Sequence, residues 1–341
     1  MAAAQGRITV LGAGSWGTAL AALLAANGHV VRLWAREESM VEALQTAREN
    51  ARYLPGIPLA PSIQPTRDRR EAVAEAEVIV FAVPSGALRQ VTEEFAPYLT
   101  PDVLLLSASK GLEDSTGLRM SQVLAAILPN AEARTVVLSG PNLAVEMARG
   151  VPTASVAASL NPEAVAAIQK LFTYQSPPTF RVYTSGDVIG VELGGAIKNV
   201  IAIGAGVCDG LGFGDNAKAA LMTRGLSEAV RLGRAQGADE MTFMGLSGVG
   251  DLIATGASSL SRNYRVGKAL GQGRSLFDTL AELGQVAEGV PTTRALCDLA
   301  ARSHIEMPLC SALNAVLFEN RSAPEMIHAL MLRPPKPERA A

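Results

Sequence analysis

The residue best suited to chemistry is a lysine in the middle of an apolar segment. Lys198 and Asn199 interrupt the stretch 188–207, which is apolar on nearly every helical face. A buried ammonium group is costly unless it reaches a polar cavity, and partial desolvation lowers its pKa. Such an amine exchanges a proton near neutral pH, so we predict that Lys198 is a general acid/base. The alternative is a structural pairing of Lys198 with Glu192 or Asp187 at a domain contact.

Three further groups of polar residues follow strand ends or glycine-rich turns. Lys110 comes just past the predicted strand 103–106, where it could hold an anionic substrate or polarise a carbonyl group; the alternative is an ordinary surface lysine. Asp251 stands at an expected helix start, where its carboxylate could cap the helix or orient Lys198 or a substrate hydroxyl. Residues 261–263 place a hydroxyl, a guanidinium and an amide in a polar turn, a combination suited to phosphate.

A glycine-rich loop near the N-terminus predicts a nucleotide site. The apolar run 8–11 reads as a buried strand, Gly12, Gly14 and Gly17 follow in G-x-G-x-x-G spacing, and an amphipathic helical pattern then begins. The first glycine allows a tight turn, the second lets backbone approach a pyrophosphate, and the third lets the helix pack against the strand. The alternative is a strand-to-helix turn that is merely rich in glycine.

The end of the second predicted strand, 29–34, bears on the choice of cofactor. An NAD-selective site usually has Asp or Glu about 20 residues after the glycine motif, to hold the ribose 2′-hydroxyl. Arg36 stands there instead, followed by Glu37. An arginine can pair with a 2′-phosphate, so NADP(H) is favoured, while Glu37 keeps NAD(H) possible. The alternative is a solvated surface arginine.

The order of predicted elements indicates an α/β fold, with an N-terminal Rossmann-like doubly wound parallel sheet and an all-helical C-terminal domain. We expect the domains at 1–185 and 186–332, and a disordered tail at 333–341. Four prolines predict an extended surface loop over 50–66, and Asn142 is expected to cap a short helix. The further predicted strands are 78–83, 103–106, 135–139, 153–157 and 179–183.

From about residue 185 the pattern becomes helical throughout. The segment 188–207 should be a buried central helix, and its glycines at 194, 195, 204 and 206 indicate close packing against another helix or a ligand. A second long helix is expected over 215–234 and short helices from 270 to 332, with 288–291 as a loop. Apolar, glycine-rich helices also make a homodimer plausible.

Composition narrows the possible classes of protein. The 341 residues are 48% hydrophobic and 18% charged, with a formal net charge of −2, so we expect neither nucleic acid nor membrane as a partner. We find no uninterrupted apolar run of about 18 residues and expect no signal peptide. The three cysteines form no C-x-x-C pair, so we predict no metal site, no disulfide framework and a cytoplasmic location. His29, His304 and His328 lie outside every motif and should be structural.

Nine short motifs give the chain a specific family resemblance. Between roughly residues 8 and 332 it resembles the bacterial NAD(P)-dependent sn-glycerol-3-phosphate dehydrogenases. The motifs are G-A-G-S-W-G-T-A-L at 12–20, Y-L-P-G-I at 53–57, A-V-P-S at 82–85, S-K-G-L-E at 109–113, S-G-P-N-L-A-V-E at 139–146, E-L-G-G-A-I-K-N-V at 192–200, S-G-V-G-D-L at 247–252, S-R-N at 261–263 and V-A-E-G at 286–289.

The resemblance implies reduction of dihydroxyacetone phosphate to sn-glycerol 3-phosphate with NADPH or NADH, which supplies phospholipid synthesis. It implies that Lys198 is the proton donor and acceptor. The implied substrate-binding residues are Lys110, Gly140, Asn142, Lys198, Asp251, Ser261, Arg262 and Asn263. The expected dinucleotide-binding residues are Gly12, Gly14, Ser15, Trp16, Gly17, Arg36, Lys110, Ala144, Arg262, Val286 and Glu288. The alternatives are a reductase of the same architecture acting on another 2-keto or 3-hydroxy acid, and a non-catalytic NADP(H)-sensing protein.

Overall fold

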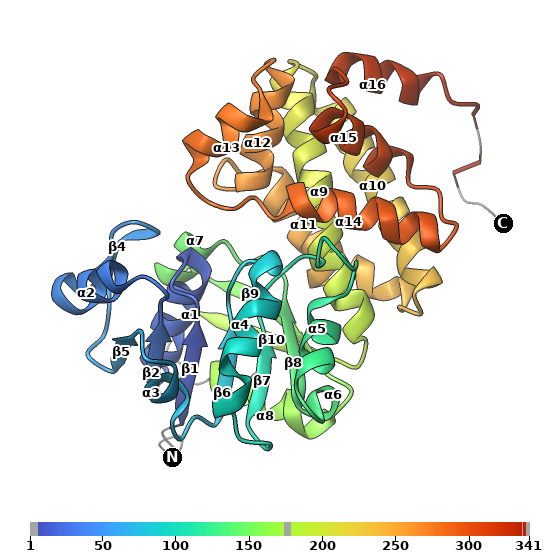
Figure 1. The fold of residues 1–341 in the computed structure, drawn as a ribbon. Helices are drawn as coiled ribbons and strands as arrows, with labels where there is room; N and C mark the ends of the chain where they lie inside the picture. Colours follow the sequence, from blue (N-terminus) through green and yellow to red (C-terminus); the bar gives the residue numbers. More distant parts are fainter. Residues whose placement is uncertain (1–5, 174–178, 336, 339–341) are drawn as a thin grey trace.

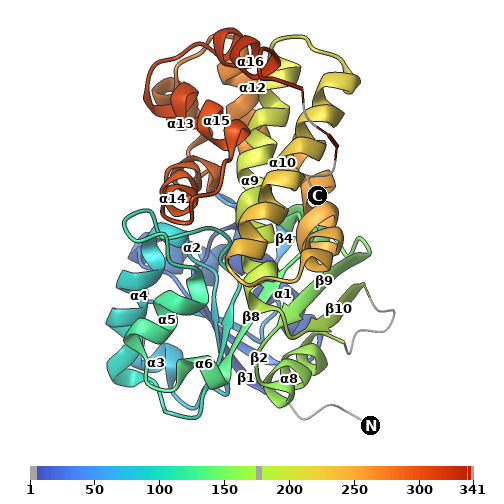
Figure 2. The same cartoon turned by 90° about the vertical axis from the view of Figure 1, so that its right-hand side faces the viewer.

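A computed structural model describes residues 6–173, 179–335, 337 and 338. In Figure 1 a twisted sheet flanked by helices forms the lower part of the molecule, and a cluster of helices forms the upper part. The long helix α9 (Val188–Gly210) runs from the sheet into that cluster, as Figure 2 also shows. The predicted fold class, a doubly wound sheet followed by helices alone, is confirmed.

In the described part of the chain the main sheet has eight strands, in the order β10-β9-β8-β7-β6-β1-β2-β5. Every neighbouring pair is parallel except β8 and β9, which run antiparallel. The prediction of a wholly parallel sheet was therefore wrong at this one pair. The eight strands are β1 (Arg7–Leu11), β2 (Val30–Trp34), β5 (Ile63–Thr66), β6 (Val78–Phe81), β7 (Leu104–Ser107), β8 (Thr135–Ser139), β9 (Thr153–Ala158) and β10 (Phe180–Ser185).

Alternating side chains bury both faces of this sheet. In β6, Val78 and Val80 join one core with the helices α1 and α8, whereas Ile79 and Phe81 join a second core with α3, α4 and α5. The strands are apolar on both sides because helices cover both sides. The helices and 3₁₀ turns of this half are α1 (Ser15–Ala26), α2 (Glu38–Ala47), α3 (Arg69–Val73), η1 (Ser85–Ala87), α4 (Leu88–Phe95), η2 (Ala96–Tyr98), α5 (Met120–Ile127), α6 (Ala131–Arg134), α7 (Ala144–Ala148) and α8 (Pro162–Phe172).

The segment 50–66 differs from the predicted loop. It contributes to a small antiparallel hairpin of β3 (Glu49–Asn50) and β4 (Leu54–Pro58), and then forms β5 of the main sheet. Pro65 is tolerated because β5 is an edge strand, where one side of the backbone needs no ladder hydrogen bond. The number of prolines was a misleading signal here, since the destabilisation that a proline causes depends on whether its strand is central or at the edge of the sheet.

The C-terminal half is helical and is built around α9, which is buried along most of its length, as predicted. Its neighbours include α10, α11, α12 and α14. The elements that follow α9 are α10 (Asp215–Ala235), η3 (Glu240–Met244), the π-helical turn η4 (Leu246–Gly250), α11 (Asp251–Gly256), α12 (Arg262–Gly271), α13 (Leu276–Leu283), α14 (Gly289–Arg302), α15 (Pro308–Phe318) and α16 (Ala323–Met331).

The glycines of α9 have the reason predicted for them. A Cβ on Gly206 would lie 2.1 Å from the carbonyl oxygen of Tyr264 in α12, so the two helix backbones touch there. A Cβ on Gly195 would lie 2.5 Å from the hydroxyl oxygen of Ser139, at the end of β8. Glycine therefore lets α9 approach both the helical half and the sheet closely enough to bring Lys198 between them.

The helix α9 is long and apolar enough to cross a membrane, with a mean hydropathy of 1.5, but 89% of its most apolar stretch is buried inside the protein. This burial is that of a core helix. The sulfur atoms of Cys297 and Cys310, on α14 and α15, lie 3.4 Å apart as free thiols.

Within the predicted tail, the described residues 333–335, 337 and 338 form neither helix nor strand, and the prediction for 336 and 339–341 lies outside the described residues.

Candidate active site

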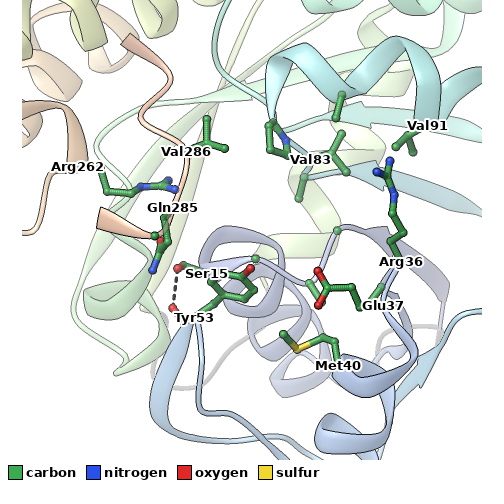
Figure 3. A pocket seen from close by; sticks show the side chains of 18 of the residues that line it. Ser15, Arg36, Glu37, Met40, Tyr53, Val83, Val91, Arg262, Gln285 and Val286 are labelled. Carbon is green, nitrogen blue, oxygen red and sulfur yellow. Dashed lines mark hydrogen bonds between the residues drawn. The ribbon is translucent and has the colours of Figure 1, made fainter. Parts of the chain in front are cut away.

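A cleft lies between the carboxyl ends of the central strands and the helical half. It contains two adjoining cavities, of about 710 Å³ and about 340 Å³. Both are lined by residues from each half, with Ser15 and Val83 from the sheet half facing Arg262 and Val286 from the helical half (Figure 3). Because ligands of open α/β sheets bind beyond the carboxyl ends of the strands, this cleft is the candidate active site.

The glycine loop has the geometry that a pyrophosphate needs. Gly12 has φ +112°, and a Cβ there would lie 2.7 Å from the carbonyl oxygen of Ala82. A Cβ on Gly14 would meet nothing within 4 Å, so this residue opens directly onto the larger cavity. Gly14 is also the N-cap of α1 and supplies no side-chain cap, which leaves the first N–H groups of that helix available to an anion.

The neighbours of this loop are held in place by backbone contacts. A Cβ on Gly17 would lie 1.9 Å from the oxygen of Gly12, so only glycine fits this strand-to-helix packing. The Ser15 hydroxyl donates to the carbonyl oxygen of Tyr53 at 2.6 Å (Figure 3), and the Trp16 indole N–H donates to that of Ala108 at 3.0 Å. Ser15 and Trp16 line the cleft, whereas Gly17 acts through packing.

At the far end of the larger cavity stand two residues of opposite charge. Arg36 and Glu37 follow β2, are exposed and line this cavity. Figure 3 shows the Arg36 side chain beside Val91 and the Glu37 carboxylate between Arg36 and Tyr53. The cleft therefore offers both a cation for a 2′-phosphate and a carboxylate for a 2′-hydroxyl.

A chain of three charged groups forms the buried end of the cleft. Lys198 Nζ lies 3.0 Å from Asp251 Oδ1, and Lys110 Nζ lies 2.8 Å from Asp251 Oδ2. Asp251 is 2% exposed and Lys198 is 8% exposed. The proposed structural pairing of Lys198 was wrong, since Glu192 binds Arg119 and Asp187 caps α9. Asp251 therefore contacts both lysines, as its predicted role in orienting Lys198 requires.

Burial and charge together set the protonation of this group. Burial, helped by the positive charges of Lys110 and Arg262, lowers the pKa of Lys198 to about 8 against the raising effect of Asp251. Burial alone would raise the pKa of Asp251, but the two ammonium groups together hold it below its ordinary value. The result is a permanent carboxylate beside an amine that titrates near physiological pH.

Thr255, one turn further along α11, belongs to the same group and was missed by the sequence interpretation. Lys198 Nζ donates to its Oγ1 at 2.8 Å, and this hydroxyl donates in turn to Asp251 Oδ1 at 3.1 Å. The signal was available in the spacing, because residues four apart on a helix share a face. Thr255 limits the positions that the Lys198 ammonium can adopt.

Lys110 is held by two more acceptors besides Asp251. Its Nζ donates to the carbonyl oxygen of Gly140 at 2.8 Å and to Asn142 Oδ1 at 2.6 Å. The prediction that Asn142 caps the next helix was wrong, because Leu143 is the N-cap of α7 and makes no side-chain capping bond. The Asn142 side chain instead accepts a hydrogen bond from Lys110 and donates one to the hydroxyl of Ser155.

The residues 261–263 form a helix start rather than a turn. Ser261 caps α12 by accepting from Tyr264 N–H at 3.2 Å, and Arg262 is the first helical residue. The N–H groups of Arg262 and Asn263 precede the first intrahelical bond, from Arg265 to Ser261, so this end is suited to an anion. The Asn263 side chain is engaged elsewhere, with Asn199 and the N–H of Gly289.

Glu288 connects the two halves of the cleft. Its carboxyl oxygens accept from the N–H of Ser85 at 3.1 Å and from the Ser85 hydroxyl at 2.5 Å. Burial raises the pKa of Glu288, against the lowering effect of these bonds and of Arg262. Ala144, Val286 and Glu288 all line the smaller cavity. The predicted loop 288–291 is instead the start of α14, whose N-cap is Glu288.

Most of the predicted site residues thus meet in one cleft. Asp251 lies beneath its surface, bonded to the two lysines, and Gly17 and Gly140 act through the backbone. Among residues 6–173, 179–335, 337 and 338, no group of three or more His, Cys, Asp or Glu side chains is placed to hold a metal. His29 bonds to the backbone groups of Gly6 and Leu171.

Comparison with known proteins gives one consistent family. Residues 7–165 match the N-terminal domain, and residues 187–328 the C-terminal domain, described as NAD-dependent glycerol-3-phosphate dehydrogenase. The chain is 50% identical to glycerol-3-phosphate dehydrogenase [NAD(P)+] of Geobacter sulfurreducens, over 98% of this chain and 99% of that one. It is 46% identical to the Bacillus subtilis protein of the same name, over 96% and 94%.

A solved structure extends the likeness to three dimensions. The crystal structure of glycerol-3-phosphate dehydrogenase from Coxiella burnetii superposes with a TM-score of 0.92 at 37% identity. The match covers 96% of this chain and 99% of that one.

Proposed function

The chain belongs to the NAD-dependent glycerol-3-phosphate dehydrogenase family, and we propose that it reduces dihydroxyacetone phosphate to sn-glycerol 3-phosphate with NADPH or NADH. The observation that carries this assignment is the Lys198–Asp251–Lys110 group, placed at the buried end of a dinucleotide-sized cleft. The product is the backbone of glycerophospholipids, so the reaction supplies their synthesis.

The nicotinamide, when bound, supplies the hydride that reduces the C2 carbonyl carbon. The Lys198 ammonium hydrogen-bonds the carbonyl oxygen, stabilises the negative charge that develops there and donates a proton to it. Asp251 and Thr255 hold this ammonium in one position. With a pKa of about 8, Lys198 can donate its proton near neutral pH and regain one from solvent. No histidine or metal takes part in this scheme.

The substrate phosphate is bound by the N-terminus of α12. Arg262 lines both cavities and is close enough for its charge to lower the pKa of Lys198. The free N–H groups of this helix and the Ser261 hydroxyl supply further donors. Lys110 and Asn142 complete the substrate-binding set from the sheet side. Binding the remote phosphate positions C2 against Lys198.

The glycine loop, Ser15 and Trp16 would hold the dinucleotide. Ala144, Val286 and Glu288 lie along the smaller cavity, where the nicotinamide end would reach Lys198. Arg36 lies at the opposite end and favours the 2′-phosphate of NADPH. The absence of a side-chain cap on α1 and the open space at Gly14 support this placement.

Three further features belong to the same proposal. The domains are 1–185 and 186–332, with the site at their junction. The protein acts in the cytoplasm on small molecules, without nucleic acid or membrane. It is a homodimer, supported by exposed apolar side chains on neighbouring elements of the helical half: Met241 and Met244 of η3 are 70% and 50% exposed, and Ile253 of α11 is 58% exposed. Light scattering on the purified protein tests the dimer.

One assay tests the activity. The purified full chain should consume NADPH only when dihydroxyacetone phosphate is added. With the same substrate it should consume NADH more slowly. A panel with 2-ketopantoate and other 2-keto acids distinguishes another reductase of this architecture. Binding of NADPH without turnover of any of these substrates would identify a sensing protein and overturn the proposal.

A further inference from the structure

The adenosine end of the cleft holds an ion pair that the proposed reaction does not use. Arg52 Nη1 lies 3.2 Å from Glu37 Oε2, with side chains 57% and 59% exposed. Glu37 is the N-cap of α2, but its side chain makes no capping bond. Its carboxylate therefore has Arg52 as a partner while it lines the cavity beside Arg36 (Figure 3).

The Glu37 carboxylate disfavours the binding of NADPH at this end of the cleft. A ribose 2′-phosphate carries about two negative charges near neutral pH, and a carboxylate beside it is repulsive. The same carboxylate suits NADH, because it can accept a hydrogen bond from a ribose 2′-hydroxyl. NADPH binding at this end of the cleft therefore needs a positive charge at the 2′-phosphate that offsets the repulsion from Glu37.

Arg52 is placed to supply that neutralising charge. It lies in the turn between β3 and β4, and its guanidinium stands 4.9 Å from the centre of the Tyr53 ring, which itself lines the cavity. An arginine that leaves an exposed carboxylate loses little, since exposed pairs contribute roughly 0–1 kcal/mol. A phosphate offers the same guanidinium a bidentate partner of higher charge.

The turn that carries Arg52 is fixed to the glycine loop. Asn50 Nδ2 donates to the oxygen of Ala13 at 2.9 Å and to Thr18 Oγ1 at 2.8 Å, and its Oδ1 accepts from the N–H of Tyr53 at 3.1 Å. The Ser15 hydroxyl adds a bond to the oxygen of Tyr53. These bonds fix the backbone beside Arg52 relative to the glycine loop, while the Arg52 side chain is 57% exposed.

We propose that Arg52 determines cofactor specificity: it pairs with Glu37 in the free protein, transfers to the 2′-phosphate when NADPH binds, and leaves Glu37 to accept the 2′-hydroxyl when NADH binds. Arg36 then forms the second side of the phosphate site. This inference rests on the use of both cofactors under the proposed function. It explains how one cleft, with a carboxylate inside it, accepts either dinucleotide.

The test compares Arg52→Ala, Glu37→Gln and the double variant in the full-length protein. Dissociation constants for NADPH and NADH are measured by calorimetry without substrate, and kcat/KM with dihydroxyacetone phosphate. Arg52→Ala should weaken NADPH about tenfold and change NADH by less than about twofold, because only the 2′-phosphate loses a charge partner. Glu37→Gln should weaken NADH about threefold and restore most of the NADPH affinity in the double variant.

A neighbouring ion pair supplies the matched control. Arg67 and Glu38 lie 2.6 Å apart, with side chains 58% and 69% exposed, and neither lines the cavity. Arg67→Ala should leave both cofactors unchanged. Raising the ionic strength to about 1 M should shrink the effect of Arg52→Ala, because the screening length falls to about 3 Å. Arg52→Lys should recover part of the NADPH affinity.

Two results would overturn the inference. One is an Arg52→Ala variant that weakens NADPH and NADH equally, which would mean a structural role for the hairpin turn. The other is an Arg52→Ala variant that behaves like Arg67→Ala. Failure of the proposed function is separate, because the unmodified protein would then bind cofactor without oxidising it in the presence of dihydroxyacetone phosphate.

Discussion

Two ion pairs of almost equal length stand at opposite ends of the cleft. Lys198 and Asp251 are 3.0 Å apart at the buried end, with side chains 9% and 2% exposed. Arg52 and Glu37 are 3.2 Å apart at the open end, with side chains more than half exposed. Water screens the second pair and lets its members exchange partners, whereas burial keeps Lys198 and Asp251 next to each other while Lys198 gains and loses its proton.

The difference between the two ends lies in the elements that carry them. Lys198 comes from the middle of α9 and Asp251 from the start of α11, and the close packing of these helices removes both from water. Arg52 and Glu37 come from a hairpin turn and a helix cap at the edge of the sheet. We therefore propose that the buried end tunes a pKa for catalysis and that the exposed end adapts to the cofactor.

Replacing the buried amine should have the largest effect. Lys198→Ala should lower kcat for dihydroxyacetone phosphate reduction by about 10³-fold or more, because the proton donor is lost. The dissociation constant for NADPH should stay within about twofold of the unmodified value. Stopped-flow turnover and calorimetry measure the two quantities. Lys170→Ala, at an exposed position on α8, is the control. Turnover near the normal rate would remove Lys198 from the mechanism.

Removing the counter-charge should have the next largest effect. Asp251→Asn should lower kcat about 100-fold, because two lysines then share a buried site without a carboxylate. The pKa of Lys198 should fall below about 8, since Asp251 is the group that raises it. The pH profile of the variant should therefore turn down at lower pH. Asp102→Asn, an exposed position, should retain the unmodified profile.

The phosphate site should affect substrate binding more than chemistry. Arg262→Ala should raise KM for dihydroxyacetone phosphate about 10- to 100-fold, because a charge-assisted bond to the phosphate is lost. In the unmodified protein, inorganic phosphate or phosphite should raise the rate of reduction of dihydroxyacetone, which lacks the phosphate of the substrate. Steady-state kinetics, with Lys268→Ala on the same helix as the control, measure both. An unchanged KM would place the phosphate elsewhere.

The tuned amine also predicts a pH dependence. Reduction requires the protonated form of Lys198, so kcat/KM should fall about tenfold for each pH unit above its pKa, which lies at about 8. Oxidation of sn-glycerol 3-phosphate requires the neutral amine, so its rate should rise through the same pH range. Profiles measured in both directions on the same preparation should cross near this pKa. Parallel profiles in the two directions would argue against a shared acid/base.

Changing the exposed end should have the smallest effect on catalysis. Arg36→Ala should raise KM for NADPH about tenfold and leave KM for NADH nearly unchanged, because only NADPH carries the 2′-phosphate. The value of kcat should be the same with either cofactor bound. Steady-state titrations with the two cofactors provide this comparison. Equal changes in both KM values would exclude a role at the 2′-phosphate.

Local patterns were enough to predict the parts of the site that depend on neighbours in the chain. The helix after the glycine turn and the buried helix 188–207 with a lysine inside it were confirmed, since each is a property of a short segment. The catalytic role of Lys198 stays a prediction. Structural features that depend on residues distant in the chain were predicted less well. The prolines of 50–66 indicated a loop, because a segment cannot show that it will become an edge strand.

What the sequence alone determined is the set of chemical groups and the class of fold, because residue type and periodicity are local properties. Only the tertiary structure decided which groups meet. Asp251 joins Lys198 and Lys110, rather than Glu192 or Asp187 pairing with Lys198, because α9, α11 and the strand ends converge and exclude water there. Asn142 binds Lys110 instead of capping a helix, and Arg52 reaches Glu37 across a hairpin. Burial also set the pKa of Lys198, since desolvation is a property of the folded surroundings and not of the residue.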